Sequence, residues 1–294
     1  MKKLFAVLLV IISIVSLFSV SVSAAGNVYT IDIDVCFNQT QARSMLSMIN
    51  NLRKPQNAWY WNETNSEKLI FPNLKPLVYD YELEKIAMQR AAEIAVSYDH
   101  TRPDGTTCFT AFNDDYMWRG ENIAMGQPTA EDVFESWAET DDAYSGQGHR
   151  RNMLNSNFTS VGIGHVIVNG VHFWVQEFGS PTLSQTHTEP CDTTKSVKMD
   201  ISSSLPFSIY SFTSINEKGI TVDKSTDIPS THITFQNKFT VTDFQMRNAD
   251  YLIADSSVAV IKNNTIYGIA TGQTTLTVSF ADKKLEIPIN VISA

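Results

Sequence analysis

The sequence predicts an α+β domain followed by an all-β domain. Between about residues 40 and 137, apolar residues recur at the spacing of amphipathic helices. Residues 161–168 and 171–178 have the composition of two strands, and the intervening Asn169-Gly170 suits a two-residue type I′ turn. From about residue 195 onward, apolar residues alternate by twos in short runs, which predicts the strands of a small β-sandwich.

Length and composition describe a globular, acidic chain. The 294 residues are 43% hydrophobic and 18% charged, and 22 Lys+Arg against 31 Asp+Glu give a net charge of −9. This length suits one large or two ordinary domains. Phosphate binding needs a stripe of Lys and Arg, and the sequence has none, so we expect no nucleic-acid partner.

The first 25 residues have the pattern of a secretory signal peptide. Lys2 and Lys3 precede an apolar run over residues 4–22, and the small residues Ser23–Ala25 follow. The run is also just long enough for an uncleaved membrane anchor. We expect cleavage and an extracellular protein, with association to the cell surface left open.

Three helices are predicted in the first domain. The apolar face of the first comprises Met45, Met48, Ile49 and Leu52. Asp80 is a good N-cap for the second, and Thr129 with Asp132 has capping-box spacing for the third. The interval 98–128 is long and rich in Gly, Asp and Asn, and a loop of that length in a compact domain is usually functional.

The division between the domains is predicted near Asp192. The stretch 180–194 contains two prolines and many Ser and Thr residues, which is typical of a linker. We therefore expect a first domain over residues 36–192 and a β-sandwich over residues 195–294.

Three polar clusters remain after sharper motifs are excluded. The chain has no Walker loop, no His-Glu-x-x-His and no Cys-x-x-Cys. The clusters occupy residues 98–105, 120–124 and 148–154. Taken alone, a single His is most often a surface or hydrogen-bonded residue, and a Glu between Gly and Asn is most often a loop brace.

Taken together and in order, the clusters resemble a known family. His-Thr-Arg-Pro-Asp-Gly at 100–105, Gly-Glu-Asn-Ile-Ala at 120–124, Gly-His-Arg-Arg-Asn-Met-Leu at 148–154 and Phe-Trp-Val-Gln-Glu-Phe-Gly at 173–179 are similar to the CAP superfamily, in its bacterial form. That family includes cysteine-rich secretory proteins, antigen 5 and pathogenesis-related proteins. The resemblance covers about residues 40–179 and implies an α-β-α sandwich.

The resemblance also implies a cleft with two histidines and two carboxylates. The matching positions are His100, His149 and Glu121, whereas the fourth position of the eukaryotic members is occupied here by Thr140. The neighbouring Glu139 is our candidate for that fourth group. Metal is found in some family clefts, so zinc is the cofactor implied.

Two imidazoles beside carboxylates allow three uses. Neutral imidazoles are good zinc ligands, and carboxylates can orient them. A His/Glu pair can instead transfer protons as general acid and base. The third possibility is a hydrogen-bonded cluster that holds the loops together.

The three cysteines leave one thiol without a partner inside the chain. Cys36 and Cys191 lie at opposite ends of the first domain, so a disulfide between them is a candidate. Cys108 follows His100 by eight residues, which invites a Cys–His nucleophile, but a buried or unpaired thiol is the simpler interpretation.

Two further groups are predicted to be structural. Trp59, Tyr60 and Trp61 favour core packing, with stacking on sugars or contact with lipid as the alternative. Four histidines have no carboxylate or second His at ligand spacing: His165, His172, His187 and His232.

The C-terminal part has a resemblance of its own. Residues 256–260 and 266–278, with Gly272-Gln273 between two runs, resemble a bacterial Ig-like domain of the invasin/intimin type. Such modules commonly act as spacers or adhesive units on bacterial surfaces, so the resemblance implies association with a cell surface or wall.

These observations predict a secreted binding module. The cleft is expected to hold a divalent metal or a small apolar ligand of the lipid or sterol class. Enzymatic activity stays open and is the less favoured role, with a metal-assisted hydrolase of peptide or cell-wall material as the alternative. A third interpretation is a toxin- or adhesin-like partner of host proteins that uses no cleft chemistry.

Overall fold

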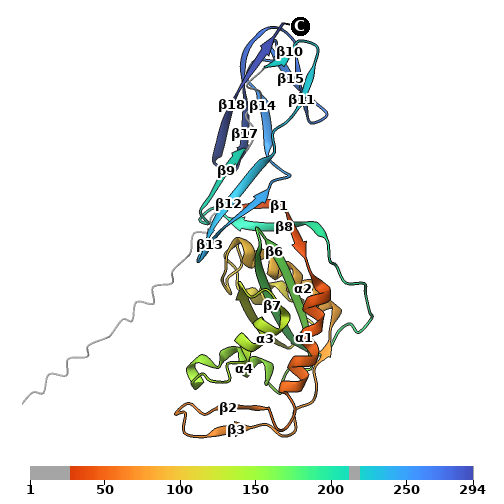
Figure 1. The fold of residues 1–294 in the computed structure, drawn as a ribbon, viewed down its shortest axis with the longest axis vertical. Coiled ribbons are helices and arrows are strands. Elements are labelled where there is room, and N and C mark those ends of the chain that lie inside the picture. Colours follow the sequence, from red (N-terminus) through yellow and green to blue (C-terminus); the bar gives the residue numbers. More distant parts are fainter. Residues whose placement is uncertain (1–26, 212–218, 294) are drawn as a thin grey trace, which may run out of the picture.

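A computed structural model describes residues 27–211 and 219–293 (Figure 1). The predicted signal peptide, residues 1–25, lies outside the described residues. Among the described residues, no helix combines the length and apolar character needed to cross a membrane.

A six-stranded sheet forms the centre of the first domain. Its strands run in the order β5 (Trp118–Met125), β7 (Val171–Ser180), β6 (Ser160–Val168), β1 (Val28–Phe37) and β8 (Thr194–Ser202), and β4 (Val78–Tyr79) pairs with β6. The predicted hairpin is the pair β6–β7, whose turn residues Asn169 and Gly170 both have positive φ, at 50° and 78°. β5 is the edge strand on one side, a position that matters for the site.

Helices cover both faces of this sheet, which confirms the three-layer α-β-α sandwich. One face carries α2 (Tyr81–Val96), and the other carries α1 (Gln39–Leu52), α3 (Ala130–Ala138) and α4 (Gly148–Met153). The predicted N-caps are present: the Asp80 side chain accepts from Glu82 N, and that of Thr129 accepts from Asp132 N.

Close packing of α2 on β6 explains two glycines inside the strand. A Cβ atom at Gly162 would lie 2.1 Å from the backbone nitrogen of Glu84, and one at Gly164 would lie 2.1 Å from the carbonyl oxygen of Ala87. Only glycine allows the helix backbone to approach the strand this closely. The helix contributes small side chains to the same contact: Ala87, Ala91, Ala92 and Ala95.

The sheet of the first domain extends beyond the expected boundary. β8 pairs antiparallel with β1 over nine residue pairs, from Val28↔Ser202 to Cys36↔Thr194. Val197, Met199 and Ile201 of β8 lie in the core beneath α2. Residues 195–202, which the sequence assigned to the sandwich, therefore complete the first sheet instead.

The rest of the chain is all-β, as predicted. One sheet contains β9 (Phe207–Ser211), β12 (Thr231–Asn237) and β13 (Thr240–Gln245). A second contains β10 (Ile220–Thr221), β14 (Asp250–Ile253), β17 (Gly272–Phe280) and β18 (Lys283–Ile292). A third contains β11 (Ser225–Asp227), β15 (Ala259–Lys262) and β16 (Thr265–Gly268). The second and third sheets share one apolar core.

The two parts meet at the sheet of β9, β12 and β13. Ile233, Phe235 and Phe244 belong to the same core cluster as the strands and α2 of the first domain. Figure 1 shows β12 and β13 beside β1 and β8, with the distal strands extending away from the first domain along the long axis. The junction is thus a packed interface.

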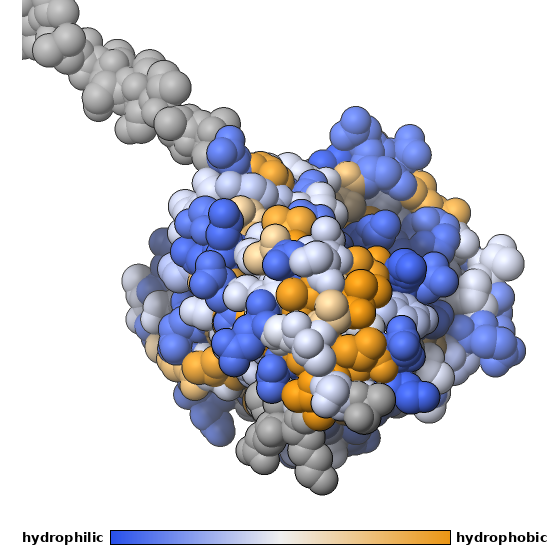
Figure 2. Space-filling model, turned by 90° about the horizontal axis from the view of Figure 1, so that it is seen from above, coloured by the Kyte–Doolittle hydropathy of each residue, from blue (hydrophilic) through white to orange (hydrophobic). Residues whose placement is uncertain are grey.

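The C-terminal end presents some apolar surface. Seen from that end, hydrophobic residues form a broken band between hydrophilic ones (Figure 2). Large apolar side chains of this part that are exposed include Leu252, Ile269 and Ile292.

Candidate functional site

The four predicted site residues line one cleft beside the edge strand β5. His100, Glu121, Glu139 and His149 all border a cavity of about 320 Å³. Its other lining residues are Asn122, Ser145, Gly146, Gly148 and Asn152. His100 lies in the loop after α2, and Glu121 lies in β5. Glu139 directly follows α3, and His149 lies at the start of α4.

His100 is oriented by Glu121. The Nδ1 atom of His100 lies 2.7 Å from Oε1 of Glu121, whose side chain is buried. Burial alone would raise the pKa of Glu121, but the hydrogen bonds from His100 and Arg90 outweigh it and lower the pKa. Glu121 is therefore an anion, and it accepts a hydrogen bond from the Nδ1–H group of His100.

A buried ion network fixes this pair from behind. Arg90 donates from Nε to Glu121 Oε2 at 2.7 Å and from Nη1 to Glu93 Oε2 at 2.8 Å. Arg102, two residues after His100, donates from Nη2 to the other oxygen of Glu93 at 2.6 Å. The loop that carries His100 is therefore anchored to α2 on both sides of the histidine.

His149 is oriented by Glu139 in the same way. Oε1 of Glu139 accepts from Nδ1 of His149, and Oε2 accepts from the backbone nitrogen of Arg150 at 3.1 Å. Glu139 lies at the C-terminus of α3 in the left-handed region, at φ 45° and ψ 41°. That conformation is unfavourable for a glutamate, and residues held in it often have a functional role. Thr140 lines a different cavity.

Both histidines thus leave Nε2 available. When Nδ1 carries the proton that is donated to a carboxylate, Nε2 holds the lone pair. Among the described residues, neither Nε2 atom has a hydrogen-bond partner. The side chains of His100 and His149 are 57% and 37% exposed, so solutes in the cleft can reach them.

Cys108 and Glu177 lie beside the cleft, although the sequence analysis did not assign them to the site. Ligand atoms of His100, Cys108 and Glu121 lie within 4.8 Å of one another. Burial, together with Glu121 and Glu177, raises the pKa of the Cys108 thiol to about 12, which fits the buried-thiol interpretation. Glu177 of β7 lies directly opposite Glu121 in the β5–β7 ladder and is fully buried.

Glu177 is held in its protonated form. Burial, and then the neighbouring Glu121, raise its pKa well above the ordinary value. The sequence did contain a sign of this residue's role. Glu177 is a charged residue in a hairpin strand whose neighbouring positions are mostly buried.

The predicted disulfide is absent, and this corrects the sequence assignment. Cys36 and Cys191 are both free thiols. Cys36 occupies an outward position of β1 between the buried Val35 and Phe37, whereas Cys191 packs against the core on the side that Val35 and Phe37 face. The two thiols therefore lie on opposite faces of the sheet.

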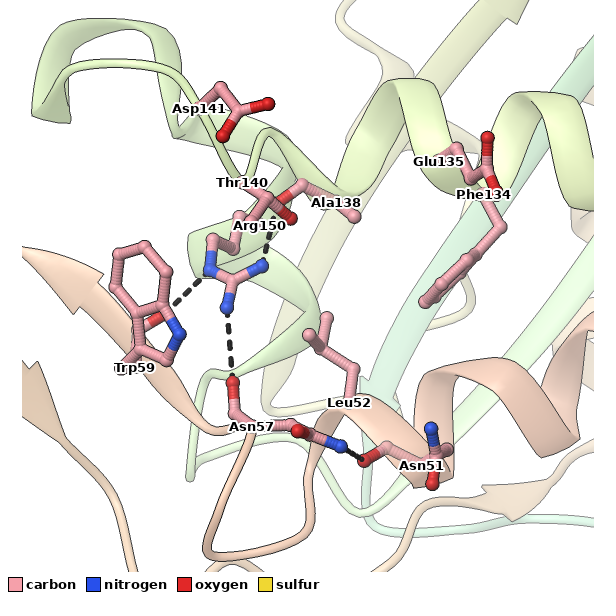
Figure 3. Close-up of a pocket in the computed structure, with 10 residues that line it drawn as sticks. All are labelled: Asn51, Leu52, Asn57, Trp59, Phe134, Glu135, Ala138, Thr140, Asp141 and Arg150. Atoms are coloured by element: carbon pink, nitrogen blue, oxygen red, sulfur yellow. Dashed lines mark hydrogen bonds between the residues drawn. The ribbon is translucent and has the colours of Figure 1, made fainter.

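Trp59 of the aromatic cluster borders a separate cavity of about 510 Å³ (Figure 3). The Trp59 ring has Lys68 Nζ at 3.6 Å and Arg150 Cζ at 4.5 Å from its centroid. Arg150 also donates to the carbonyl oxygens of Trp59, Asn57 and Ala138, as the dashed lines in Figure 3 show. These contacts support the packing interpretation of Trp59.

The remaining histidines lie outside the cleft. The ring of His165 stacks on Trp174 with centroids 3.5 Å apart, and its Nε2 is 2.9 Å from Nδ1 of His172. Burial, then His172, lowers the pKa of His165 to about 3. His187 contacts Tyr81, and His232 contacts Asp243.

Comparison with known proteins identifies the first domain. Residues 46–178 match the cysteine-rich secretory protein family, CAP. Residues 237–291 match the N-terminal β-sheet domain of hyaluronate lyase. The uncharacterized protein YkwD of Bacillus subtilis (strain 168) is 36% identical over 120 residues, which are 39% of this chain and 43% of that protein. The match thus spans less than half the length of this relative.

The solved structures that this chain is similar to include two bacterial proteins. An outer surface protein of Borrelia burgdorferi is 20% identical with a TM-score of 0.37, over 48% of this chain and 92% of that one. A cysteine-rich secretory protein of Staphylococcus aureus is 19% identical with a TM-score of 0.34, over 49% and 39% of the two chains. Because these residues match the family, contain its motifs in order and form an α-β-α sandwich, residues 46–178 are a CAP domain.

Proposed function

We propose that this protein is an extracellular binding module whose CAP cleft holds a divalent metal ion, zinc in the first instance, through Nε2 of His100 and His149. The observation that carries the proposal is the matched pair of carboxylate–histidine contacts. Glu121 and Glu139 each accept from Nδ1 and so direct the other ring nitrogen outward. Metal-bound histidines in proteins are commonly held by a carboxylate in this way.

In this proposal the two imidazoles are the protein ligands of the ion, and the carboxylates hold them in place. Glu121 already accepts from Arg90 and His100, and Glu139 accepts from His149 and a backbone N–H. The carboxylates are therefore better placed to orient the imidazoles than to bind the ion themselves. A bound zinc ion would supply a Lewis acid with positions left for water or for a ligand.

Of the two ligand classes expected from the sequence, the cleft lining favours the metal. Its residues are histidines, carboxylates, amides, a serine and glycines, with no large apolar side chain among them. An apolar ligand would gain little from such a wall.

Calorimetric titration of zinc into chelator-treated protein at pH 7 tests the proposal. We expect stoichiometric binding in the parent protein, and its loss in His100→Ala and in His149→Ala. His187→Ala is the matched control, because His187 lies outside the cleft. Glu139→Gln should weaken binding by about 10–100-fold, since the oriented tautomer loses its partner.

Absence of binding in the parent protein would contradict the proposal and leave the cluster as a brace for the loops. Unchanged binding in both histidine variants would place the metal elsewhere.

A further inference from the structure

Arg53 is a buried arginine with no carboxylate partner. It follows α1 directly, only 3% of its surface is exposed, and it lines a cavity of about 420 Å³ that shares no residue with the histidine cleft. Its Nε donates to Lys75 O at 2.8 Å, and Nη1 donates to Met153 O and Asn155 O at 2.8 and 3.2 Å. All three acceptors are neutral carbonyl groups.

Arg90 is a contrasting case, in which buried carboxylates compensate the guanidinium charge. Arg90 is equally buried, but two glutamates neutralise it, and these outweigh burial and raise its pKa. Arg53 has no such compensation, so burial lowers its pKa to about 10. In the part of the chain that the structure describes, its Nη2 atom has no hydrogen-bond partner.

The walls of the cavity add a second cation and several hydroxyl groups to Arg53. Lys75 is exposed at the cavity and has no ion pair among the described residues, and no Asp or Glu lines the cavity. Hydroxyl groups come from Ser156, Thr159 and Thr182. In a chain of net charge −9, a cavity with two cations and no carboxylate is a distinctive environment.

We propose that this cavity is a binding site for an oxyanion, with the unpartnered Nη2 of Arg53 as the donor and the Lys75 ammonium group as the second cation. Guanidinium N–H groups form strong, short hydrogen bonds with phosphate and carboxylate oxygens. Leu74, Val78 and Phe158 supply an apolar wall beside the cations. The ligand class is therefore a phosphate or carboxylate group, free or attached to a small apolar body.

Two probes distinguish these sources. Inorganic phosphate presents the oxyanion alone, and benzoate presents a carboxylate on an apolar ring. Each is titrated into the full chain by calorimetry at pH 7 and constant ionic strength, with chloride as the reference anion. Tighter binding of benzoate would mean that the ligand carries an apolar body that contacts the apolar wall. Tighter binding of phosphate would mean that the site recognises phosphate groups.

Lys75→Gln is the principal variant, because the Arg53 contact at this position uses only the backbone carbonyl. We expect saturable binding of at least one probe and a loss of threefold or more in Lys75→Gln. Lys85→Gln is the matched control, since Lys85 is an exposed lysine on α2 that pairs with Glu82. It should bind as the parent does.

Arg53→Lys, where it folds, should abolish the tighter binding, whereas His100→Ala should leave it unchanged. Absence of saturable binding of both probes at millimolar concentration would overturn the proposal and leave Arg53 as a brace between α4 and the segment around Lys75. Equal binding by Lys75→Gln and the parent would overturn it as well.

Discussion

Glu177 places a carboxyl group in the middle of the first sheet, where neither of its oxygens accepts a hydrogen bond from a described residue. Its neighbour across the ladder, Glu121, is anionic and already bound by Arg90 and His100. Two carboxylates this close cannot both be ionised, and the fully buried one holds the proton. Glu121, the carboxylate of the cleft, therefore lies beside a second acid, Glu177, that is fully buried.

Replacing Glu177 by glutamine should stabilise the protein near neutral pH. The folded-state pKa is raised, so the folded protein keeps a proton that the unfolded chain releases above about pH 4.5. Stability therefore falls as the pH rises from that value toward the folded pKa. Glu177→Gln removes this loss and should raise the free energy of unfolding at pH 7, by about 1.4 kcal/mol for each pH unit over which the loss accumulates.

Urea denaturation at pH 4 and at pH 7 measures the effect. The gain should be largest at pH 7 and small at pH 4, where the parent side chain is protonated in both states. An equal effect at both pH values would mean that shape, and not the proton, decides the contribution of this residue.

The three cysteines should differ sharply in reactivity. Cys36 is exposed and Cys191 partly exposed, whereas Cys108 is buried, and burial is the main cause that raises its pKa to about 12. The thiolate is the reactive form. Titration of the reduced, native protein with a thiol reagent at pH 8 should modify two thiols quickly and the third only after denaturation. Rapid reaction of Cys108 would contradict its placement beside Glu121.

Sequence reasoning found the site residues that lie in continuous motifs. His100, Glu121 and His149 each follow from a local pattern that the family resemblance supports. Glu139 could be proposed only as one of several neighbouring acids, since its role depends on the left-handed turn after α3. Glu177 lies next to Glu121 because of the register between β5 and β7, and a sequence does not specify which residues of two strands lie opposite each other.

At the scale of elements, the end of α2 depends on side chains from another part of the chain. The last turn contains no basic residue, and Ser97 at the C-cap is extended. Asn237 donates to Ile94 O and Ala95 O at 2.8 and 3.0 Å, and Thr242 donates to Ala95 O at 2.7 Å. Strands β12 and β13 thereby satisfy carbonyl groups that the helix leaves free.

Thr242→Val tests this contact with little change of shape. The substitution leaves the Ala95 carbonyl with one donor fewer in a buried site, so we expect a loss of about 1–2 kcal/mol in the free energy of unfolding. Thr240→Val on the same strand is the control, because its exposed hydroxyl makes only a 3.4 Å contact to the next residue. Equal urea midpoints for the two variants would contradict the capping role.

The helices and the hairpin were predictable because their signals are local. Asp80 and Thr129 are caps with the expected contacts, and Asn169-Gly170 forms the expected turn. β8 was not separable from the later strands by sequence, because its alternation of apolar and polar residues resembles theirs. Its partner, β1, lies about 165 residues earlier, and no local pattern reports such a pairing.

At the scale of the whole molecule, the junction joins the two parts through apolar and polar contacts. Phe235, Phe244 and Met246 extend the core of the first domain. Arg247 forms an ion pair with Asp34 at 2.6 Å, and Asn248 donates to Thr30 O at 2.7 Å. β1 is therefore covered on its outer side by β8 and by residues of the C-terminal part.

Shortening the chain at the boundary expected from sequence should then destabilise the CAP domain. A chain of residues 27–192 lacks β8 and loses the burial of Val197, Met199 and Ile201. At about 1.5–3 kcal/mol for each buried side chain, the loss is roughly 5 kcal/mol or more, comparable to the whole stability of many domains. A chain of residues 27–205 keeps β8 and should be intermediate, because only the cover from β12 and β13 is missing.

Tryptophan fluorescence during urea denaturation measures this order directly, since all five tryptophans lie in the first domain. The midpoint should fall from residues 27–293 to 27–205, and residues 27–192 should show either a still lower midpoint or no cooperative transition. Loss of the β8 ladder also exposes the edge of β1, which favours aggregation. Equal midpoints for 27–192 and 27–205 would instead make β8 an accessory strand and restore the boundary near Asp192.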